Sequence, residues 1–582
     1  MRFALLPTLL FPLALGSAAR AQVDAGELVP ALQLRDLDGR ALELRELARE
    51  RGAIVVLRDE ACPLCRRWVP RLQELAQRWR ESGPRFLFAN SGDAADAAAL
   101  CADRERLHIE APYVADTGGV LARSLGASST TEVFLIDVRG TLVYRGAIDD
   151  QHAVGSSKDE PTRRWLEDAV AAMERGERPS VERTSSPGCA LELGAGERVA
   201  SEATPTYHGT IARLVERRCL ACHREGGVAP FPLATHAQLI RRKATIASVV
   251  ESGVMPPWGA AEGSGPWRND FGLRASERAA LLAWIAGGAP EGDAALAPLR
   301  ARGADFGASS GWSLGEPDLV VELPRAEKVK AQGTMDYRYQ WVQSPLEEER
   351  WVRAVELRPT APAVVHHVLT FLEDPPKDLR ELGQKRRGGL GGYFAGLVPG
   401  QGPTVFPTET GKRLPARAWI KFQLHYTANG EATSDRTQMA FWFHATPPKH
   451  ELVTASAHQT RFEIPPGAAN HEVRAKTSFR EGAWLSAFSP HMHVRGKAFR
   501  YELELPDGAR RTLLDIPRYD FDWQIRYELA EPLFVPAGAV LHATAWYDNS
   551  AANPANPDPT RAVRFGEQTW DEMMIGYFER WR

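Results

Sequence analysis

Two histidines lie one residue apart in "SPHMHVRGK", a segment that otherwise reads as a strand. Because side chains at positions i and i+2 of a strand project from the same face, His491 and His493 can point toward one object while Met492 points away. A shared metal ion is one interpretation of the pair, and the polar outer face of a sheet is the other. Further ligand-type residues elsewhere in the chain would favour the metal.

Other strand-like segments of the C-terminal half supply such residues. "VVHHVLTF" carries His366 and His367, and since neighbours on a strand face opposite ways, both can reach one metal only at a strand end or a bulge. "KFQLHYT" carries His425, with Gln423 on its face of the strand. Each of these segments taken singly is equally compatible with a structural role.

A fourth segment, "GEQTWDEMMIGYF", carries Met573, with Tyr577 on the same face of the expected strand. The order HH, QLHY, HxH and DEM along the chain resembles the copper type II, ascorbate-dependent monooxygenases. That family includes peptidylglycine α-hydroxylating monooxygenase and dopamine β-monooxygenase, and the resemblance covers the residues after Asp318.

The resemblance implies two copper ions per chain, each held by one β-sandwich. It assigns His366, His367 and His425 to the first, electron-transfer copper. It assigns His491, His493 and Met573 to the second, oxygen-binding copper, and it places Gln423 and Tyr577 near the two sites as catalytic candidates. Imidazole serves both copper oxidation states and a thioether prefers Cu(I), so these ligand sets suit copper better than iron or zinc.

Two departures from the family restrict the expected substrate. The interlocking disulfides of the family are absent, because no cysteine follows Cys222. The peptide-processing branch has an arginine two residues before its HxH, where this chain has Ser489. We therefore expect O2 and a small organic molecule as substrates, and not a glycine-extended peptide.

A haem c attachment pattern, "CLACH", precedes this region and supplies Cys219, Cys222 and His223. The sixth iron ligand is predicted to be Met255 in "ESGVMPPWG", with His236 or His208 as alternatives. Helical patterns flank the site in "TIARLVERR" and in "SERAALLAWIAGGAP", the latter with a serine N-cap and a Gly-Gly stop. The segment resembles small bacterial cytochrome c modules that carry CxxCH and MPPW.

A third motif, "CPLC", places Cys62 and Cys65 between the apolar strand "AIVVL" and a helical pattern. This arrangement, with the later strands "RFLFANS" and "EVFLIDVRGTLVYRG", resembles the thioredoxin/peroxiredoxin-like superfamily. The residue before the strand "EVFLID" is Thr131, where the family has a cis-proline. Either an active or an inactive dithiol is therefore compatible with the pattern. Cys101 and Cys189 remain and could form one disulfide.

The first 21 residues are typical of a cleaved secretory signal, with one arginine, an apolar run and a small-x-small site; a retained anchor is the alternative. No other segment is apolar enough to span a membrane. A formal charge of -3, with 44% hydrophobic and 25% charged residues, gives no indication of nucleic-acid binding. We expect a periplasmic or secreted protein.

The expected fold class is multidomain: a thioredoxin-like α/β domain, a small all-α cytochrome c, and two all-β jelly-roll-like sandwiches. The predicted limits are a signal peptide at 1–21, the thioredoxin-like domain at 22–177, a linker at 178–204, the cytochrome c domain at 205–295, a linker at 296–315, and sandwiches at 316–452 and 453–582.

The combined reading is an exported copper-dependent monooxygenase that hydroxylates a C-H bond. Its electrons would come from the fused haem c, from an ascorbate-like reductant or from a periplasmic redox protein. Two alternatives stay open: a non-catalytic copper and haem electron carrier, and a thiol-disulfide oxidoreductase whose C-terminal sandwiches only bind partners.

Overall fold

The computed structural model describes residues 23–582 except 60–61, 92–96, 154–155, 159, 190, 192, 194–203, 226, 230, 300–310, 333–334, 375–391, 399–400 and 429–430. The predicted signal peptide at 1–21, or the retained anchor that is its alternative, thus lies outside the described residues. The chain forms two compact units, one of Met1–Leu214 with Ala275–Ala304 and one of Val215–Arg274 with Asp305–Arg582. None of the helices in the described part of the chain has the length and apolar content needed to span a bilayer.

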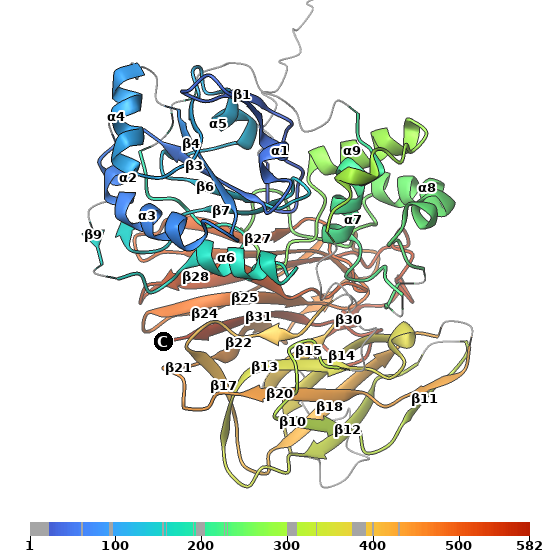
Figure 1. Cartoon of the computed structure of the whole chain (residues 1–582). Coiled ribbons are helices and arrows are strands. Elements are labelled where there is room, and N and C mark those ends of the chain that lie inside the picture. The colour runs from blue at the N-terminus through green and yellow to red at the C-terminus, as the bar shows by residue number, and fades with distance from the viewer. Residues whose placement is uncertain are drawn as a thin grey trace, which may run out of the picture. The chain divides into compact units, whose positions relative to one another are not determined.

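The first unit is built on a five-stranded sheet of order β5-β4-β3-β6-β7 (Figure 1). Strands β3, β4 and β5 are parallel, and β6 and β7 form an antiparallel hairpin at the other edge. The bounds are β3 Ala53–Arg58, β4 Arg85–Asn90, β5 Tyr113–Ala115, β6 Val133–Ile136 and β7 Leu142–Gly146, with short pairs β1 Gln33–Arg35 and β2 Ala41–Glu43, and β8 His152–Ala153 and β9 Ser156–Ser157.

Helices cover both faces of this sheet because its central strands are apolar on both sides. In β3, Ile54 and Val56 enter one core and Val55 and Leu57 the other. The helices of the first face are α3 Val69–Arg78, α4 Ala97–Leu107 and α6 Trp165–Glu174, and those of the second are α1 Leu44–Ala48 and α5 Val120–Leu125. The prediction of a thioredoxin-like α/β domain is thereby confirmed.

The helical pattern after the CPLC motif forms two helices and not one. Helix α2, Pro63–Arg67, ends at Trp68, and α3 begins at Val69 with a proline in its first turn. Pro70 lacks a backbone N–H and fits only the start of a helix, which accounts for the division.

A buried ion pair ties β3 to α4 in this unit. Arg58 donates from Nε and Nη2 to the two carboxylate oxygens of Asp103 at 2.9 Å each, and Tyr113 donates its hydroxyl to the same carboxylate at 2.7 Å. Both charged side chains are 1% exposed. Each charge therefore depends on its partner for the solvation that water would otherwise provide.

Replacing Asp103 with alanine should destabilise this unit by about 3–5 kcal/mol, because Arg58 would keep a buried charge without a counterion. The transition of the unit in calorimetric unfolding of the whole chain measures the loss. Asp38→Ala is the matched control, since Asp38 pairs with Arg104 at the surface, where water can replace the lost partner, and it should change stability far less. Equal losses for both variants would contradict the assignment.

The polar segment after residue 178, predicted to be a linker, pairs in part with this unit. Arg145 in β7 exchanges backbone hydrogen bonds with Glu182 and Thr184, and Ser128 and Thr130 bond with Leu191 and Cys189. Backbone N–H and C=O groups of the edge strand β7 and of the loop before β6 need hydrogen-bond partners. The residues after position 178 provide them.

The helical segment contains a π-helical turn η1 Tyr207–Ile211, α7 Ala212–Arg218, α8 His236–Glu251, α9 Ala275–Ala286 and a 3-10 turn η2 Ala294–Leu296. Helix α8 begins with a capping box between Thr235 and Gln238. Helix α9 ends at the predicted Gly287–Gly288 stop. The helix begins at Ala275, and Ser276 already lies inside its first turn. The prediction of Ser276 as the N-cap is therefore wrong.

The first β-sandwich packs two sheets over one core, to which both contribute apolar side chains. One sheet has the order β10-β20-β13-β17-β21, and the other has the order β12-β18-β14-β15. The strands are β10 Leu319–Glu322, β11 Glu327–Val329, β12 Arg338–Gln343, β13 Arg350–Arg358, β14 Val365–Leu372, β15 Tyr393–Leu397, β16 Thr404–Val405, β17 Thr410–Leu414, β18 Trp419–Tyr426, β19 Thr433–Asp435, β20 Gln438–Phe443 and β21 His450–Glu451, with a 3-10 turn η3 Pro362–Val364 before β14.

The second β-sandwich has the same two-layer plan, with sheets β22-β31-β25-β28 and β24-β29-β26-β27 (Figure 1). Its strands are β22 Val453–Gln459, β23 Glu463–Ile464, β24 His471–Ser478, β25 Ala483–His491, β26 Gly496–Glu504, β27 Arg510–Ile516, β28 Tyr527–Val535, β29 Val540–Tyr547, β30 Val563–Arg564 and β31 Met574–Trp581. The strand-rich, multidomain character predicted for the C-terminal half is confirmed.

A buried charge cluster joins the two sandwiches. Lys412 of β17 donates to Glu579 of β31 at 3.0 Å, and Arg526 donates to the other carboxylate oxygen at 2.6 Å. Burial acts to raise the pKa of Glu579, but the charges of Arg526 and Lys412 outweigh it and lower that pKa to about 2. The Lys412–Glu579 pair therefore links the two sandwiches through buried charges, whereas Arg526 pairs with Glu579 and Glu528 inside the second sandwich.

Candidate functional site

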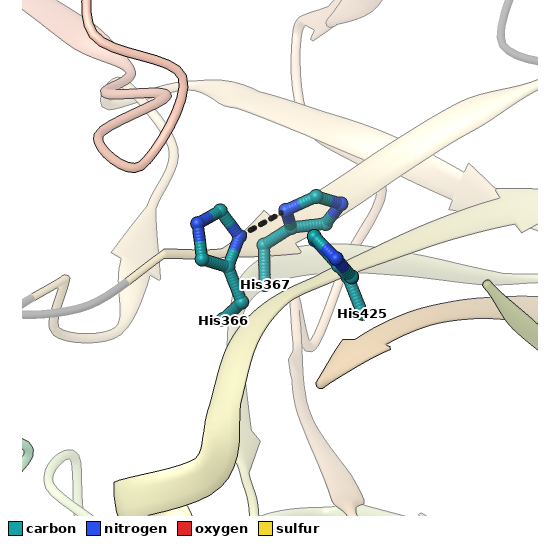
Figure 2. A group of neighbouring side chains, drawn as sticks. All are labelled: His366, His367 and His425. Carbon is teal, nitrogen blue, oxygen red and sulfur yellow. Dashed lines mark hydrogen bonds between the residues drawn. The ribbon is translucent and has the colours of Figure 1, made fainter. Parts of the chain in front are cut away.

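Three histidines of the first sandwich converge on one point (Figure 2). His367 of β14 lies directly across from His425 of β18 in the antiparallel register, and that register shifts by one residue between Val365 and His367. His366 is the extra residue of this bulge, so its side chain turns to the side of its neighbour, as the sequence required for a shared ion. One ring nitrogen from each histidine lies within 4.8 Å of the others.

The hydrogen-bond pattern of these rings fits a bound cation. Nδ1 of His366 and Nδ1 of His367 face each other at 3.0 Å, while Nδ1 of His425 and Nε2 of His367 are buried without a hydrogen-bond partner (Figure 2). Nε2 of His366 bonds to Asp522 at 2.9 Å, which fixes the ring with Nδ1 toward the cluster. Buried ring nitrogens left in this way are costly unless an ion accepts their lone pairs.

Burial keeps the imidazoles of His367 and His425 in the neutral form that binds metals. It lowers the pKa of His425 to about 3, with a further contribution from His366, and lowers that of His367 well below its usual value. Protonation of His367 or His425 would create a positive charge in a site that is shielded from water. Lone pairs are therefore available at neutral pH.

Gln423 lies in β18 on the face of His425, as predicted, and donates to the hydroxyl of Tyr339 at 3.3 Å. Its neighbours Phe422 and Leu424 are fully buried in the core. The structure gives Gln423 a position beside the cluster, and its catalytic role stays a prediction.

The second histidine pair lies at the end of β25. His491 and His493 share one side of the chain with their ring centroids 5.2 Å apart, and Met492 points into the core, as the strand period predicts. Nδ1 of His491 bonds to Gln524 at 2.6 Å, and Nδ1 of His493 bonds to the carbonyl of Asp571 at 3.1 Å. Nε2 of His493 is buried without a partner.

Met573 directly precedes strand β31, which pairs with β25 beside this pair. The register ends with Ile575 opposite His491, and the role of Met573 as a ligand of this set stays a prediction. Met573, Ile575 and Tyr577 form one buried cluster, which confirms the predicted face. Tyr577 stacks on Tyr393 of the first sandwich with centroids 5.1 Å apart.

Protonation of the second pair is opposed by burial as well. The pKa of His491 is lowered to about 4, and that of His493 to about 3, where the neighbouring His491 adds to the effect of burial. Glu572 beside them is fully buried and accepts the backbone N–H of His493 at 2.9 Å. Burial raises the pKa of this carboxyl to about 8, against the backbone N–H groups and the Arg495 charge that lower it.

Phe521 lies between the two histidine sets. Its ring centroid is 5.4 Å from that of His366, 6.5 Å from His367 and 5.9 Å from His425. The same ring lies 6.1 Å from His493 of the second sandwich. The three histidines of the first set and His493 of the second set thus lie near the same aromatic side chain.

Sequence reasoning missed the loop that supports both sets, "RYDFDWQIRY". It supplies Phe521 between the sets, Asp522 to His366 and Gln524 to His491. The signal available in the sequence was the alternation of acidic or amide residues with aromatic residues in this loop. That alternation does not indicate which histidines the loop contacts.

The predicted haem ligands lie in the turns of the helical segment. Cys219 and Cys222 follow α7 and are half-buried, and the backbone N–H of His223 bonds to the carbonyl of Cys219 at 2.9 Å. Nδ1 of His223 bonds to the carbonyl of Phe231 at 2.9 Å, which leaves Nε2 for another partner. Met255 lies in the turn after α8, half-buried.

The CPLC cysteines lie at the start of α2, and both are buried. Thr130 donates its hydroxyl to Sγ of Cys62 at 3.2 Å and accepts a hydrogen bond from Cys65 at its carbonyl at 3.1 Å. The contact with Cys65 is the main cause that lowers the pKa of the Cys62 thiol, and it raises the pKa of Cys65 together with burial. The thiolate form is therefore favoured at Cys62 over Cys65.

The remaining cysteines do not lie together. Cys101 is in α4, whereas Sγ of Cys189 lies 3.2 Å from Sγ of Cys62. The suggested Cys101–Cys189 disulfide is not formed, and all six thiols are free in the structure.

Comparison with known proteins supports the assignment of the first unit. The sequence model of the AhpC/TSA family matches residues 25–145. The thiol-disulfide oxidoreductase ResA of Halalkalibacterium halodurans is 28% identical over 136 residues, which cover 23% of this chain and 76% of that protein. The N-terminal region is thus a thioredoxin-like domain of the thiol-disulfide oxidoreductase type.

Solved structures are similar to less than a third of the chain. A hypothetical protein of Sinorhizobium meliloti is 26% identical, with a TM-score of 0.28, over 30% of this chain and 97% of that one. A thiol:disulfide interchange protein DsbE of Chlorobium tepidum is 18% identical, with a TM-score of 0.20, over 22% of this chain and 86% of that one.

Proposed function

We propose that this protein is an exported copper-dependent monooxygenase that hydroxylates a C-H bond of a small organic substrate with O2. The observation that carries the proposal is the convergence of His366, His367 and His425 at a strand bulge, with ring nitrogens that lack protein partners. The predicted second set, His491, His493 and Met573, supports it through His493, whose ring lies near the same Phe521 ring that contacts the first set.

The donor sets favour copper over other metals. Three neutral imidazoles hold copper in both oxidation states, and a set with one thioether favours Cu(I) and leaves a position open for O2. Copper bound there would supply one-electron transfer at the first set and O2 reduction at the second.

The residues of the chain have separate tasks in this proposal. Asp522 and Gln524 orient the rings of His366 and His491 by hydrogen bonds to their outer nitrogens. Tyr577 and Gln423 lie beside the two sets, where they would position substrate. The low exposure of both sets limits access of water to the reacting atoms.

Metal analysis of the full chain, purified from an exporting host, tests the proposal. We expect about two copper ions per chain and O2 consumption that requires both copper and a reductant such as ascorbate. A protein that binds copper but consumes no O2 with any donor would be an electron carrier. Zinc, or no metal, at the histidine sets would contradict the proposal.

The helical segment fits a covalently bound haem that delivers electrons. Cys219 and Cys222 would hold the porphyrin, and His223, oriented by the carbonyl of Phe231, would ligate iron. Met255 is the proposed sixth ligand, which favours a relatively high potential.

Replacing both Cys219 and Cys222 with serine should abolish covalent haem, because no thiol remains to form a thioether with the vinyl groups. Haem that stays with the polypeptide after extraction with acidified acetone measures the result. Cys101→Ser, which removes a thiol of α4, should keep the full haem content. Covalent haem in the double variant would contradict the attachment.

A second function, thiol-disulfide exchange, is favoured by the contacts of Cys62 and by the similarity to ResA. The two functions separate by mutation. Cys62→Ser with Cys65→Ser should abolish exchange and leave O2 consumption unchanged if the copper site is independent, whereas loss of both would assign the activity to the thiols.

A further inference from the structure

Cys189 meets Cys62 although 127 positions separate them along the chain. Its thiol donates to Sγ of Cys62 at 3.2 Å, so Cys62 receives hydrogen bonds from both Cys189 and Thr130. Two sulfur atoms at this separation need only small side-chain rotations to reach the bonded distance of about 2.05 Å.

Backbone hydrogen bonds hold Cys189 in this position. Thr130 donates its N–H to the carbonyl of Cys189 at 3.0 Å, and the N–H of Cys189 bonds to the hydroxyl of Thr130 at 3.1 Å. Leu191 donates to the carbonyl of Ser128 at 3.1 Å. The chain around Cys189 thus lies beside the loop before β6 and is held there by backbone hydrogen bonds, in the way that an extended peptide is bound by an exposed backbone edge.

The residue before Cys189 fits only as glycine. A Cβ atom at Gly188 would lie 2.1 Å from the hydroxyl of Ser129 and 2.9 Å from the backbone nitrogen of Thr131. Ser186 and Thr131 also share a hydrogen bond between their hydroxyls at 2.8 Å. The close approach of the two backbones is therefore built into the sequence, and it sets the distance between the two sulfurs.

The three thiols differ in access. Cys62 and Cys65 are 2% and 1% exposed, whereas Cys189 is exposed. An external thiol or disulfide can reach the sulfur of Cys189 without any opening of the domain, and it cannot reach the other two in the same way.

We propose that Cys189 is a third redox thiol that relays exchange between the buried Cys62–Cys65 pair and external partners through a Cys62–Cys189 disulfide. The relay rests on thiol-disulfide exchange at Cys62, the second function above, and does not depend on copper. In this relay, the segment around Cys189 occupies the place beside Cys62 that an external thiol partner would otherwise take.

The exchange balances within the protein. From a Cys62–Cys65 disulfide, the Cys189 thiol gives its proton to solvent, and its thiolate attacks the sulfur of Cys62. The Cys62–Cys65 bond breaks as the Cys62–Cys189 bond forms, and Cys65 leaves as a thiolate that takes a proton. An external dithiol then attacks Cys189, and its two electrons reduce the disulfide, which leaves three thiols in the chain and an oxidised dithiol in solution.

Disulfide mapping of the full chain tests the relay. After equilibration in oxidised dithiothreitol and alkylation of free thiols, Cys65→Ser should hold nearly all its protein as the Cys62–Cys189 disulfide. Cys189→Ser should hold only Cys62–Cys65, and Cys101→Ser should match the wild type. Free Cys189 in the Cys65→Ser protein would overturn the relay, and absence of any disulfide at Cys62 in all variants would overturn exchange as well.

Kinetics and a second variant separate the relay from a merely structural contact. Reduction of the oxidised domain by dithiothreitol should be slower by roughly tenfold or more in Cys189→Ser, since the remaining disulfide is buried. Gly188→Val keeps every thiol but removes the close approach, so it should lose the Cys62–Cys189 disulfide and show the same slow reduction. Wild-type rates in both variants would overturn the proposal.

Discussion

Alanine at position 367 is expected to lower the copper content from about two ions per chain to about one, because a site with two imidazoles no longer surrounds the ion. His367 is 1% exposed and lies across from His425 at the centre of the first set. The loss of affinity should exceed the roughly 10–100-fold that follows removal of an outer hydrogen-bond partner of a ligand. Copper analysis after dialysis against a weak chelator measures the change.

The complementary variant, Met573→Ala, should weaken copper at the second set alone, so its effect on metal content adds to that of His367→Ala. His542→Ala is a matched control, because this histidine of β29 bonds to Glu504 through Nε2 and belongs to neither set. Unchanged copper in His367→Ala, or equal loss in the control, would contradict the two-site assignment. O2 consumption should vanish in both ligand variants.

Glutamine at position 579 should destabilise the two sandwiches by about 3–5 kcal/mol, since Lys412 and Arg526 would lose the carboxylate that compensates their buried charges. The side chains of Lys412 and Glu579 are 5% and 6% exposed, so water cannot replace the lost partner. Calorimetric unfolding of the full chain should show the transition of the sandwiches at a lower temperature, with that of the thioredoxin-like domain unchanged.

Glu481→Gln provides the control for this experiment, because Glu481 pairs with Arg582 at the surface, where both side chains are more than half exposed. Its effect should stay within about 0.5 kcal/mol. If Glu579→Gln lost no more stability than Glu481→Gln, the charges of Lys412 and Arg526 would have to be compensated by groups other than Glu579.

The same carboxylate predicts a pH dependence with a definite sign. The folded pKa of Glu579, about 2, lies below the ordinary glutamate value, so its contribution is complete above about pH 4.5. The contribution is lost as the pH falls from there toward 2. Wild-type stability should therefore decrease over this interval more steeply than that of Glu579→Gln, which has no carboxyl to protonate.

The sequence by itself determined the thioredoxin-like sheet, the strand-rich C-terminal half and the faces of the ligand strands. These features depend on local period: the apolar run of β3 and the i, i+2 relation of His491 and His493 are properties of a strand wherever it lies. The bulge at His366 was one of two arrangements to be expected, because two adjacent histidines can share an ion only at a strand end or a bulge, and the structure decided between them.

Only the tertiary structure decided which distant residues meet. Phe521, Asp522 and Gln524 reach the histidine sets from a loop of the second sandwich, and Cys189 reaches Cys62 from a segment whose composition indicates a linker. The physical reason is that burial and backbone pairing between segments far apart in the chain leave no periodic signal in either segment. Polar side chains acquire their partners there through the shape of the folded chain, and sequence spacing does not encode that shape.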